Sequence, residues 1–237
     1  MNRKMQIVGL VFIVSILLYG FGFWIYKMNL FSKFYYLASG KKTVEDIVIQ
    51  YEKKVDSIFL PIFEKNNIPY PPENLTLIGF KEEQVLEVWT VANGKPYFLK
   101  KYLFTTTSGK QGPKLIRGDG QIPEGFYKVE AFNPNSAFHS SLKINYPNEF
   151  DLAKAKADSR NDPGDNIFIH GKDKSIGCIA IGDEAIEELF VLAAKTPRSR
   201  IDVILFPYDM RITKSRRECE NCPPWTEEMY KRLELAS

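Results

Sequence analysis

The sequence is short of residues that bind metals. Among 237 residues it has two histidines and three cysteines, of which Cys178 stands alone while Cys219 and Cys222 form a C-x-x-C pair. A structural zinc site takes four such ligands, so this pair would need two more from a very small supply. We therefore expect no metal site. The pair is either a disulfide or two free thiols, and an oxidising compartment would favour the disulfide.

The chain also lacks a large excess of charge of one sign and the common nucleotide-binding motifs. The formal net charge is +3, and the basic residues are scattered among acidic ones, which argues against a nucleic-acid partner. No G-x-G-x-x-G occurs, and Ser108-Gly109-Lys110 lacks the remaining residues of a phosphate loop. No cofactor, metal or organic, is implied.

A long apolar run lies near the N-terminus. Residues from Ile7 to Tyr26 are almost wholly apolar or aromatic and carry no charge, which is long enough to cross a hydrocarbon layer of about 30 Å. The run has no nearby small-residue cleavage site, so residues 1–28 are predicted to form an uncleaved membrane anchor. Lysines on both sides of the run leave its orientation open on charge alone.

Residues 29–69 are predicted to be a helical spacer. Apolar residues recur at three- and four-residue spacing from Val44 to Ile62, and Thr43 with Asp46 resembles a capping box. This pattern predicts one amphipathic helix that packs on the following domain. None of its residue types suggests chemistry.

Residues 70–210 are predicted to be mainly β with a few helices, followed by a tail at 211–237 with a helix starting near Thr226. Short alternating or apolar runs predict strands at Leu75 to Phe80, Val85 to Val91, Tyr97 to Phe104, Phe126 to Phe132 and Ile201 to Phe206. Helical periodicity predicts a helix from Asp183 to Lys195. Long loops are expected at Gly109 to Gly125 and at Lys154 to Asn166, where they would frame a cleft.

The segment from Asn166 to Ile181 contains the residues best suited to chemistry. An apolar strand ends in His170-Gly171, and a short polar turn leads to Ser175-x-Gly177-Cys178. A tight return can bring the imidazole beside the thiol, where it would lower the thiol pKa and act as its base. The amides of Gly177 and Cys178 are candidate oxyanion donors. The alternative is a small buried cysteine with a hydrogen-bonded histidine nearby.

The same segment resembles the active-site signature of the L,D-transpeptidase (YkuD-like) catalytic domain, namely H-G, a variable loop, then S-x-G-C. Upstream pieces resemble the YafK-like subgroup of murein L,D-transpeptidases: Gly112 to Leu115, Gly118 to Gln121, Pro123 to Tyr127, Asn133 to Ser136 and Tyr146 to Asn148. Together they extend over roughly Leu75 to Met210. The resemblance implies a YkuD-like β-sandwich with a cysteine nucleophile.

Carried over residue by residue, the resemblance makes Cys178 the nucleophile and His170 the base. It also makes the backbone carbonyl of Gly171 the group that orients the imidazole. Ser175 would shape the loop and hydrogen-bond near the thiolate, although a serine in a turn needs no function. His139 either lines the substrate cleft or is a hydrogen-bonded structural residue.

One position departs from the family pattern. Arginine is usual two residues after the cysteine, and here that residue is Ala180. The cation that would bind a substrate carboxylate must then come from elsewhere, and Lys114 and Arg117 are candidates, with surface charge as the alternative reading.

The resemblance implies an acyltransferase acting on peptidoglycan stem peptides through a thioester, outside the cytoplasmic membrane. A hydrolase of the same fold, which detaches protein or peptide from peptidoglycan, is the first alternative. A silent peptidoglycan-binding module is the second.

Overall fold

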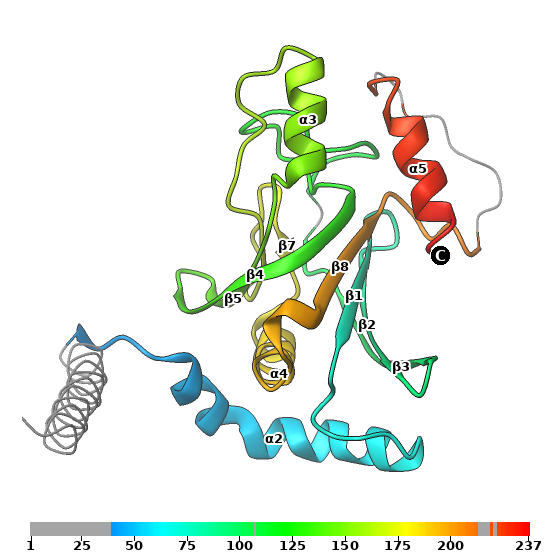
Figure 1. The fold of residues 1–237 in the computed structure, drawn as a ribbon. Helices are drawn as coiled ribbons and strands as arrows, with labels where there is room; N and C mark the ends of the chain where they lie inside the picture. The colour runs from blue at the N-terminus through cyan, green and yellow to red at the C-terminus, as the bar shows by residue number, and fades with distance from the viewer. Residues whose placement is uncertain (1–38, 107, 213–218, 220–221) are drawn as a thin grey trace, which may run out of the picture. The chain divides into compact units, whose positions relative to one another are not determined.

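A mixed sheet of eight strands forms the centre of the fold in residues 39–106, 108–212, 219 and 222–237, which the computed structural model describes (Figure 1). The predicted membrane span from Ile7 to Tyr26 lies outside these residues. Within them, no helix combines the length and the apolar character needed to cross a membrane. All elements below belong to the compact unit Val44–Ser237.

The strand order in the sheet is β3-β2-β1-β8-β4-β5-β6-β7. The strands are β1 (Leu75–Phe80), β2 (Val85–Ala92), β3 (Lys95–Leu103), β4 (Gly125–Ser136), β5 (His139–Ile144), β6 (Phe168–His170), β7 (Ile179–Ala180) and β8 (Ile201–Phe206). The β1–β8 and β6–β7 pairs are parallel and the others antiparallel.

Strand β4 links the two halves of the sheet. Its first four residues, Gly125 to Lys128, pair with β8, whereas the stretch from Val129 to Ser136 pairs with β5. The prediction of a mainly β domain with a few helices is therefore confirmed. The two halves of the sheet are joined through β4.

Helices α2 (Val44–Lys65) and α4 (Asp183–Ala194) pack together on the sheet (Figure 1). Ile47, Val55, Phe59 and Phe63 of α2 are buried in the same hydrophobic cluster as α4 and the strands. Fully burying a side chain of this size stabilises a fold by roughly 1.5–3 kcal/mol. The predicted amphipathic helix is thus part of the core of the domain, and it continues through Pro61.

Helix α5 (Thr226–Glu234) begins where the sequence predicted and packs in a second, smaller core. Met229, Tyr230 and Leu233 of α5 join Phe80 of β1 and Phe206 of β8 there. The short helix η1 (Arg198–Arg200) precedes β8.

Helix α3 (Glu149–Ala157) was not predicted, and it occupies the start of the stretch expected to be a loop. Asn148 accepts hydrogen bonds from the amides of Phe150 and Asp151, and the Asp151 side chain accepts from the Asn148 amide, which completes a capping box. The helix has little amphipathic pattern, so the cap is its main local signal.

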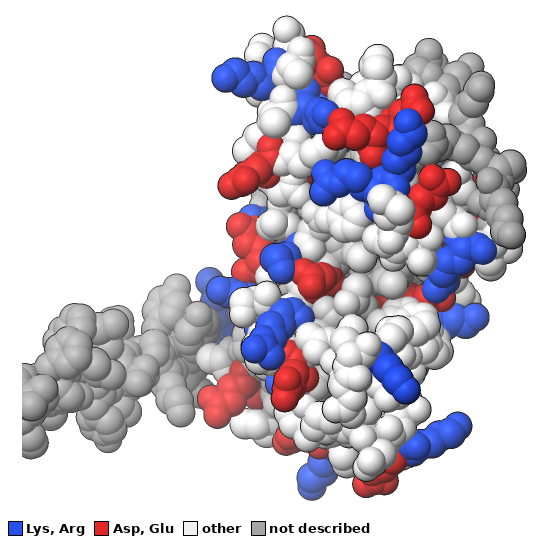
Figure 2. Space-filling model, turned by 45° about the vertical axis from the view of Figure 1, so that its right-hand side comes forward, with Lys and Arg blue, Asp and Glu red and all other residues white. Residues whose placement is uncertain are grey.

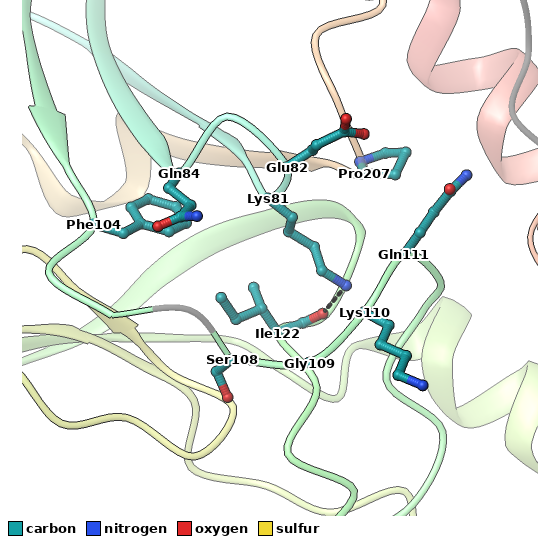
Figure 3. A pocket seen from close by; sticks show the side chains of 10 residues that line it. All are labelled: Lys81, Glu82, Gln84, Phe104, Ser108, Gly109, Lys110, Gln111, Ile122 and Pro207. Carbon is teal, nitrogen blue, oxygen red and sulfur yellow. Dashed lines mark hydrogen bonds between the residues drawn. The ribbon is translucent and has the colours of Figure 1, made fainter.

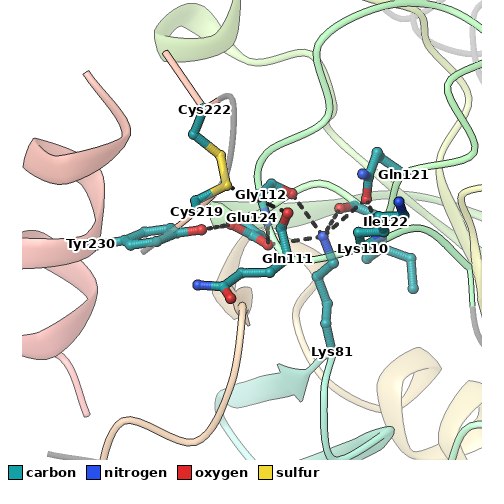
Figure 4. The surroundings of a disulfide bond; sticks show 10 residues. All are labelled: Lys81, Lys110, Gln111, Gly112, Gln121, Ile122, Glu124, Cys219, Cys222 and Tyr230. Atoms are coloured by element: carbon teal, nitrogen blue, oxygen red, sulfur yellow. Dashed lines mark hydrogen bonds and ion pairs between the residues drawn. A yellow bond between two sulfur atoms is a disulfide. The ribbon is translucent and has the colours of Figure 1, made fainter. Parts of the chain in front are cut away.

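The loop from Ser108 to Glu124 is fastened by a buried ion pair and lies against a disulfide (Figure 4). Lys81 Nζ lies 2.9 Å from Glu124 Oε1 and also donates to the carbonyl oxygens of Gly112 and Ile122. The other Glu124 oxygen accepts from Tyr230 Oη at 2.7 Å. Cys219 and Cys222 form a disulfide, the first of the two states that the sequence left open.

Candidate active site

A cavity of about 220 Å³ contains both residues predicted to carry the chemistry. His170 and Cys178 line it, together with Phe138, Ser141, Asn133 and Ser136 among others. Their approach follows from strand pairing: β6 and β7 are parallel, with His170 opposite Ala180. Cys178 directly precedes β7, so this pairing brings it close to the end of β6 that carries His170.

The imidazole of His170 is held in one orientation by its neighbour. Its Nδ1 lies 2.6 Å from the carbonyl oxygen of Gly171, the contact that the predicted orienting role requires. Nδ1–H therefore donates to this oxygen, which leaves Nε2 to accept a proton. Burial lowers the pKa of His170, although the Gly171 hydrogen bond acts in the opposite direction. The ring is thus a neutral base at neutral pH.

The thiol of Cys178 is protonated at rest. Burial raises its pKa, and the smaller opposing influences are a backbone hydrogen bond with Phe168 and the positive charge of Lys114. A neutral imidazole supplies no positive charge, so the predicted lowering of the thiol pKa by His170 would require a protonated ring and remains a prediction. Cys178 Sγ lies 3.8 Å from the carbonyl oxygen of Asn166, and its side chain stays partly exposed to an incoming substrate.

The two amides expected to bind an oxyanion already donate hydrogen bonds to serine hydroxyls. The Gly177 amide donates to Ser108 Oγ at 2.6 Å, and the Cys178 amide donates to Ser175 Oγ at 2.8 Å. Ser175 Oγ in turn donates to the Cys178 carbonyl at 2.7 Å, so it closes the turn that carries the nucleophile. Both predicted oxyanion donors lie at the site, but each already has an acceptor.

Steric constraints explain why both Gly171 and Gly177 of the motif are glycines. Gly177 has φ +97°, and a Cβ there would lie 3.0 Å from the carbonyl oxygen of Gln121. A Cβ on Gly171 would lie 2.9 Å from the carbonyl oxygen of Phe138. Any side chain at either position would push the His170 strand or the Cys178 turn away from its neighbours.

The two predicted carboxylate-binding cations are both paired within the protein. The Lys114 side chain is buried, and its Nζ contacts Asp119 Oδ1 at 2.6 Å and the Ile116 carbonyl at 3.0 Å. The Arg117 side chain is exposed and forms ion pairs with Asp162 and Asp165 at 2.7 and 2.8 Å. Lys114 is close enough to influence the thiol pKa, whereas nothing in the structure links Arg117 to the cavity. Their contact with substrate remains a prediction.

Ala180, which stands in place of the usual arginine, is fully buried in β7. His139 Nε2 lies 2.8 Å from Glu187 Oε1 of α4, a contact of the kind that its structural role predicts. A contact of His139 with substrate remains a prediction. The contact with Glu187 fixes the turn between β4 and β5.

Sequence reasoning named as site residues only His170 and Cys178 among the residues that line the cavity, and it missed Phe138 and Ser141 among the others. Phe138, in the same turn, lies with its ring centroid 4.7 Å from that of His170 and covers one side of the imidazole. Ser141 of β5 pairs directly with His170 of β6. Both lie between the matched pieces Asn133 to Ser136 and Tyr146 to Asn148, and the local sequence does not reveal that the turn and the β5–β6 register bring them to the site.

A neighbouring cavity of about 210 Å³ is less suited to chemistry (Figure 3). Lys81 and Lys110 line it, but the Lys81 ammonium is directed at protein oxygens, including the Ile122 carbonyl at 2.9 Å. Basic and acidic side chains are interspersed on the face seen in Figure 2. In the described part of the chain no group of three or more potential ligands is arranged to hold a metal.

Comparison with known proteins agrees with these features. The model of the L,D-transpeptidase catalytic domain (YkuD) matches residues 70–203. A relative from Escherichia coli K12, named "Putative L,D-transpeptidase YafK", is 31% identical over 143 residues, which cover 58% of this chain and 56% of that protein. The chain therefore spans little more than half the length of this relative.

Solved structures give more distant likenesses. The helical cell shape determining protein Pgp2 from Campylobacter jejuni aligns with a TM-score of 0.48 and 23% identity, over 57% of this chain and 48% of that one. Bd1075 from Bdellovibrio bacteriovorus aligns with a TM-score of 0.44 and 18% identity, over 71% and 56% of the two chains.

Proposed function

The chain belongs to the L,D-transpeptidase catalytic domain (YkuD) family, and from that premise we propose that it is a cysteine acyltransferase acting on the stem peptides of peptidoglycan. The observation that carries the proposal is the shared cavity of His170 and Cys178, with His170 Nδ1 held by the Gly171 carbonyl. This arrangement supplies a nucleophile, a neutral base and a fixed tautomer. A silent binding module would need none of the three.

In the proposed reaction, His170 Nε2 takes the thiol proton as Cys178 attacks the carbonyl that follows an L-centre in a tetrapeptide stem. The tetrahedral oxygen replaces Ser108 Oγ as the acceptor of the Gly177 amide, which costs a short movement of the hydroxyl. The imidazolium then gives its proton to the departing amine of the terminal D-residue. The stem remains on Cys178 as a thioester.

The fate of the thioester decides the class of product. An amine from a second stem or from an envelope protein gives a crosslink, whereas water gives cleavage. The replacement of the usual arginine by the buried Ala180 favours a substrate grip different from that of most family members, so the hydrolase stays the second candidate.

We place the catalytic domain outside the cytoplasmic membrane, anchored by the predicted span from Ile7 to Tyr26. Two arguments support this placement: the apolar character of the run and the location of peptidoglycan outside that membrane. The Cys219–Cys222 disulfide fits an oxidising compartment.

Digestion of purified peptidoglycan sacculi, with and without attached protein, tests the proposal. The full chain and its Cys178→Ala variant are compared, and the products are read by mass spectrometry. New crosslinks or exchanged terminal residues that need Cys178 identify a transferase, and released peptide or protein without new bonds identifies the hydrolase. Identical products from both chains would refute catalysis.

A further inference from the structure

The cavity beside Cys178 contains a buried hydroxyl that has no partner. Ser141 is 1% exposed, and within the described residues its Oγ makes no hydrogen bond. A buried hydroxyl left without a partner destabilises a fold, so its retention beside a reacting group calls for a ligand.

We propose that Ser141 is a water-positioning residue, whose hydroxyl together with Nε2 of His170 holds the water that hydrolyses the thioester on Cys178. The inference rests on the acyl-enzyme of the proposed function and goes beyond it by naming a group that directs the thioester towards water.

Strand register places the two groups side by side. Ser141 of β5 is the direct partner of His170 of β6 in an antiparallel pair, and directly opposed residues have Cβ atoms about 4.5–5.5 Å apart on the same face. Both side chains line the cavity that contains Cys178. Since Nδ1 of His170 is engaged by the Gly171 carbonyl, the nitrogen available to a water is Nε2.

Two other polar side chains of the cavity already accept hydrogen bonds from backbone amides. Asn133 Oδ1 accepts from the Asn135 amide at 3.0 Å, and Ser136 Oγ accepts from the Phe138 amide at 3.1 Å. Phe138 adds an aromatic wall. A buried water needs at least two hydrogen-bond partners, and Ser141 with His170 provides them. The burial of both residues suits a water better than a bulky peptide.

The step balances without any further reactant. The water oxygen attacks the thioester carbonyl while His170 Nε2 takes one water proton, and Ser141 Oγ accepts a hydrogen bond from the other. Collapse of the tetrahedral intermediate breaks the carbon–sulfur bond. The thiolate of Cys178 then recovers the proton from His170, and the stem leaves as a carboxylic acid.

The test measures how the acyl-enzyme partitions between two nucleophiles. The full chain is given a disaccharide-tetrapeptide donor with hydroxylamine as the competing amine, and mass spectrometry gives the ratio of acid to hydroxamate. In Ser141→Ala the ratio should fall about three- to tenfold, the effect of losing one hydrogen bond. Ser141→Thr, which keeps the hydroxyl, should restore it.

Ser140→Ala is the matched control. Ser140 is equally buried, at 2% exposed, but it lies on the opposite face of β5, so its variant should keep the wild-type ratio. A general loss of packing would lower both products together and leave the ratio unchanged. If Ser141→Ala does not fold, Ser141→Cys, which nearly keeps the volume but is a weaker hydrogen-bond acceptor, should show the same fall.

An unchanged ratio of acid to hydroxamate in the folded alanine or cysteine variant would overturn the inference. A higher KM for the donor with an unchanged ratio would overturn it as well, because Ser141 would then be a substrate contact. A wild-type enzyme that forms hydroxamate but no acid would overturn it too. The absence of any Cys178-dependent product would instead contradict the proposed function.

Discussion

Replacing Lys81 by methionine should lower the free energy of unfolding by more than the loss of an exposed ion pair would. The side chains of Lys81 and Glu124 are 6% and 0% exposed, and their closest atoms lie 2.9 Å apart. Removing the ammonium leaves the Glu124 carboxylate buried, with the Gly112 amide and Tyr230 Oη as its remaining donors. Breaking a buried pair in this way costs about 3–5 kcal/mol.

The loss of stability should be smaller when the unpaired negative charge of Glu124 is also removed. In Lys81→Met with Glu124→Gln, the amide can still bond to Gly112 and Tyr230, so we expect most of the lost stability to return. Lys128→Met is the matched control, because the Lys128–Asp202 pair is more than half exposed on both sides and should contribute less than about 1 kcal/mol.

Urea unfolding of the full chains in mild detergent, followed by tryptophan fluorescence, measures these differences. The rate of Cys178 alkylation gives a second readout, since the loop fastened by Lys81 also brings Ser108 to the Gly177 amide. A loss below about 1 kcal/mol for Lys81→Met, or a double variant as unstable as the single one, would refute the reasoning.

Three further changes have outcomes set by the structure. Gly177→Ala should lower product formation by about tenfold or more, because the left-handed backbone and the nearby carbonyl resist a Cβ. Phe138→Ala should raise the pKa of His170 towards its usual value by admitting water to the ring, as histidine NMR titration would show. Asp151→Asn should remove a pH dependence of stability. Burial raises the pKa of the Asp151 carboxyl from 3.8 to about 6, so between these pH values the folded state binds a proton that the unfolded state has lost. The free energy of unfolding of the wild type should therefore fall by roughly 3 kcal/mol as the pH rises through this range.

For each of these three variants, a control variant or a specific result would contradict the prediction. Phe98→Ala removes a ring of similar exposure that contacts Trp89, and it should leave the His170 titration unchanged. Unaltered kinetics in Gly177→Ala would mean that the turn tolerates a side chain. Parallel stability profiles of wild type and Asp151→Asn between pH 4 and 6, from urea unfolding at each pH, would contradict the assigned pKa.

Strongly patterned segments were predictable from the sequence. The strands Leu75 to Phe80 and Ile201 to Phe206 were predicted with the bounds that the structure has, because their apolar residues meet a buried sheet. Helix α3 was missed since its signal is a cap around Asn148 rather than an apolar stripe.

The nucleophile and its neighbour histidine lie within one short motif, so local sequence was enough to pair them. The unpartnered hydroxyl of Ser141 was beyond such reasoning, because its position depends on the register between β5 and β6. Lys114 was a candidate for substrate binding with surface charge as the alternative, and its burial against Asp119, five residues along, was predicted by neither reading.

The most direct test of the account is the mass of the intact protein after brief mixing with a disaccharide-tetrapeptide. We predict an adduct equal to the stem without its terminal D-residue, attached to Cys178 and released by hydroxylamine, and absent in Cys178→Ala. Turnover of the donor by the alanine variant, or an adduct at any other residue, would contradict it.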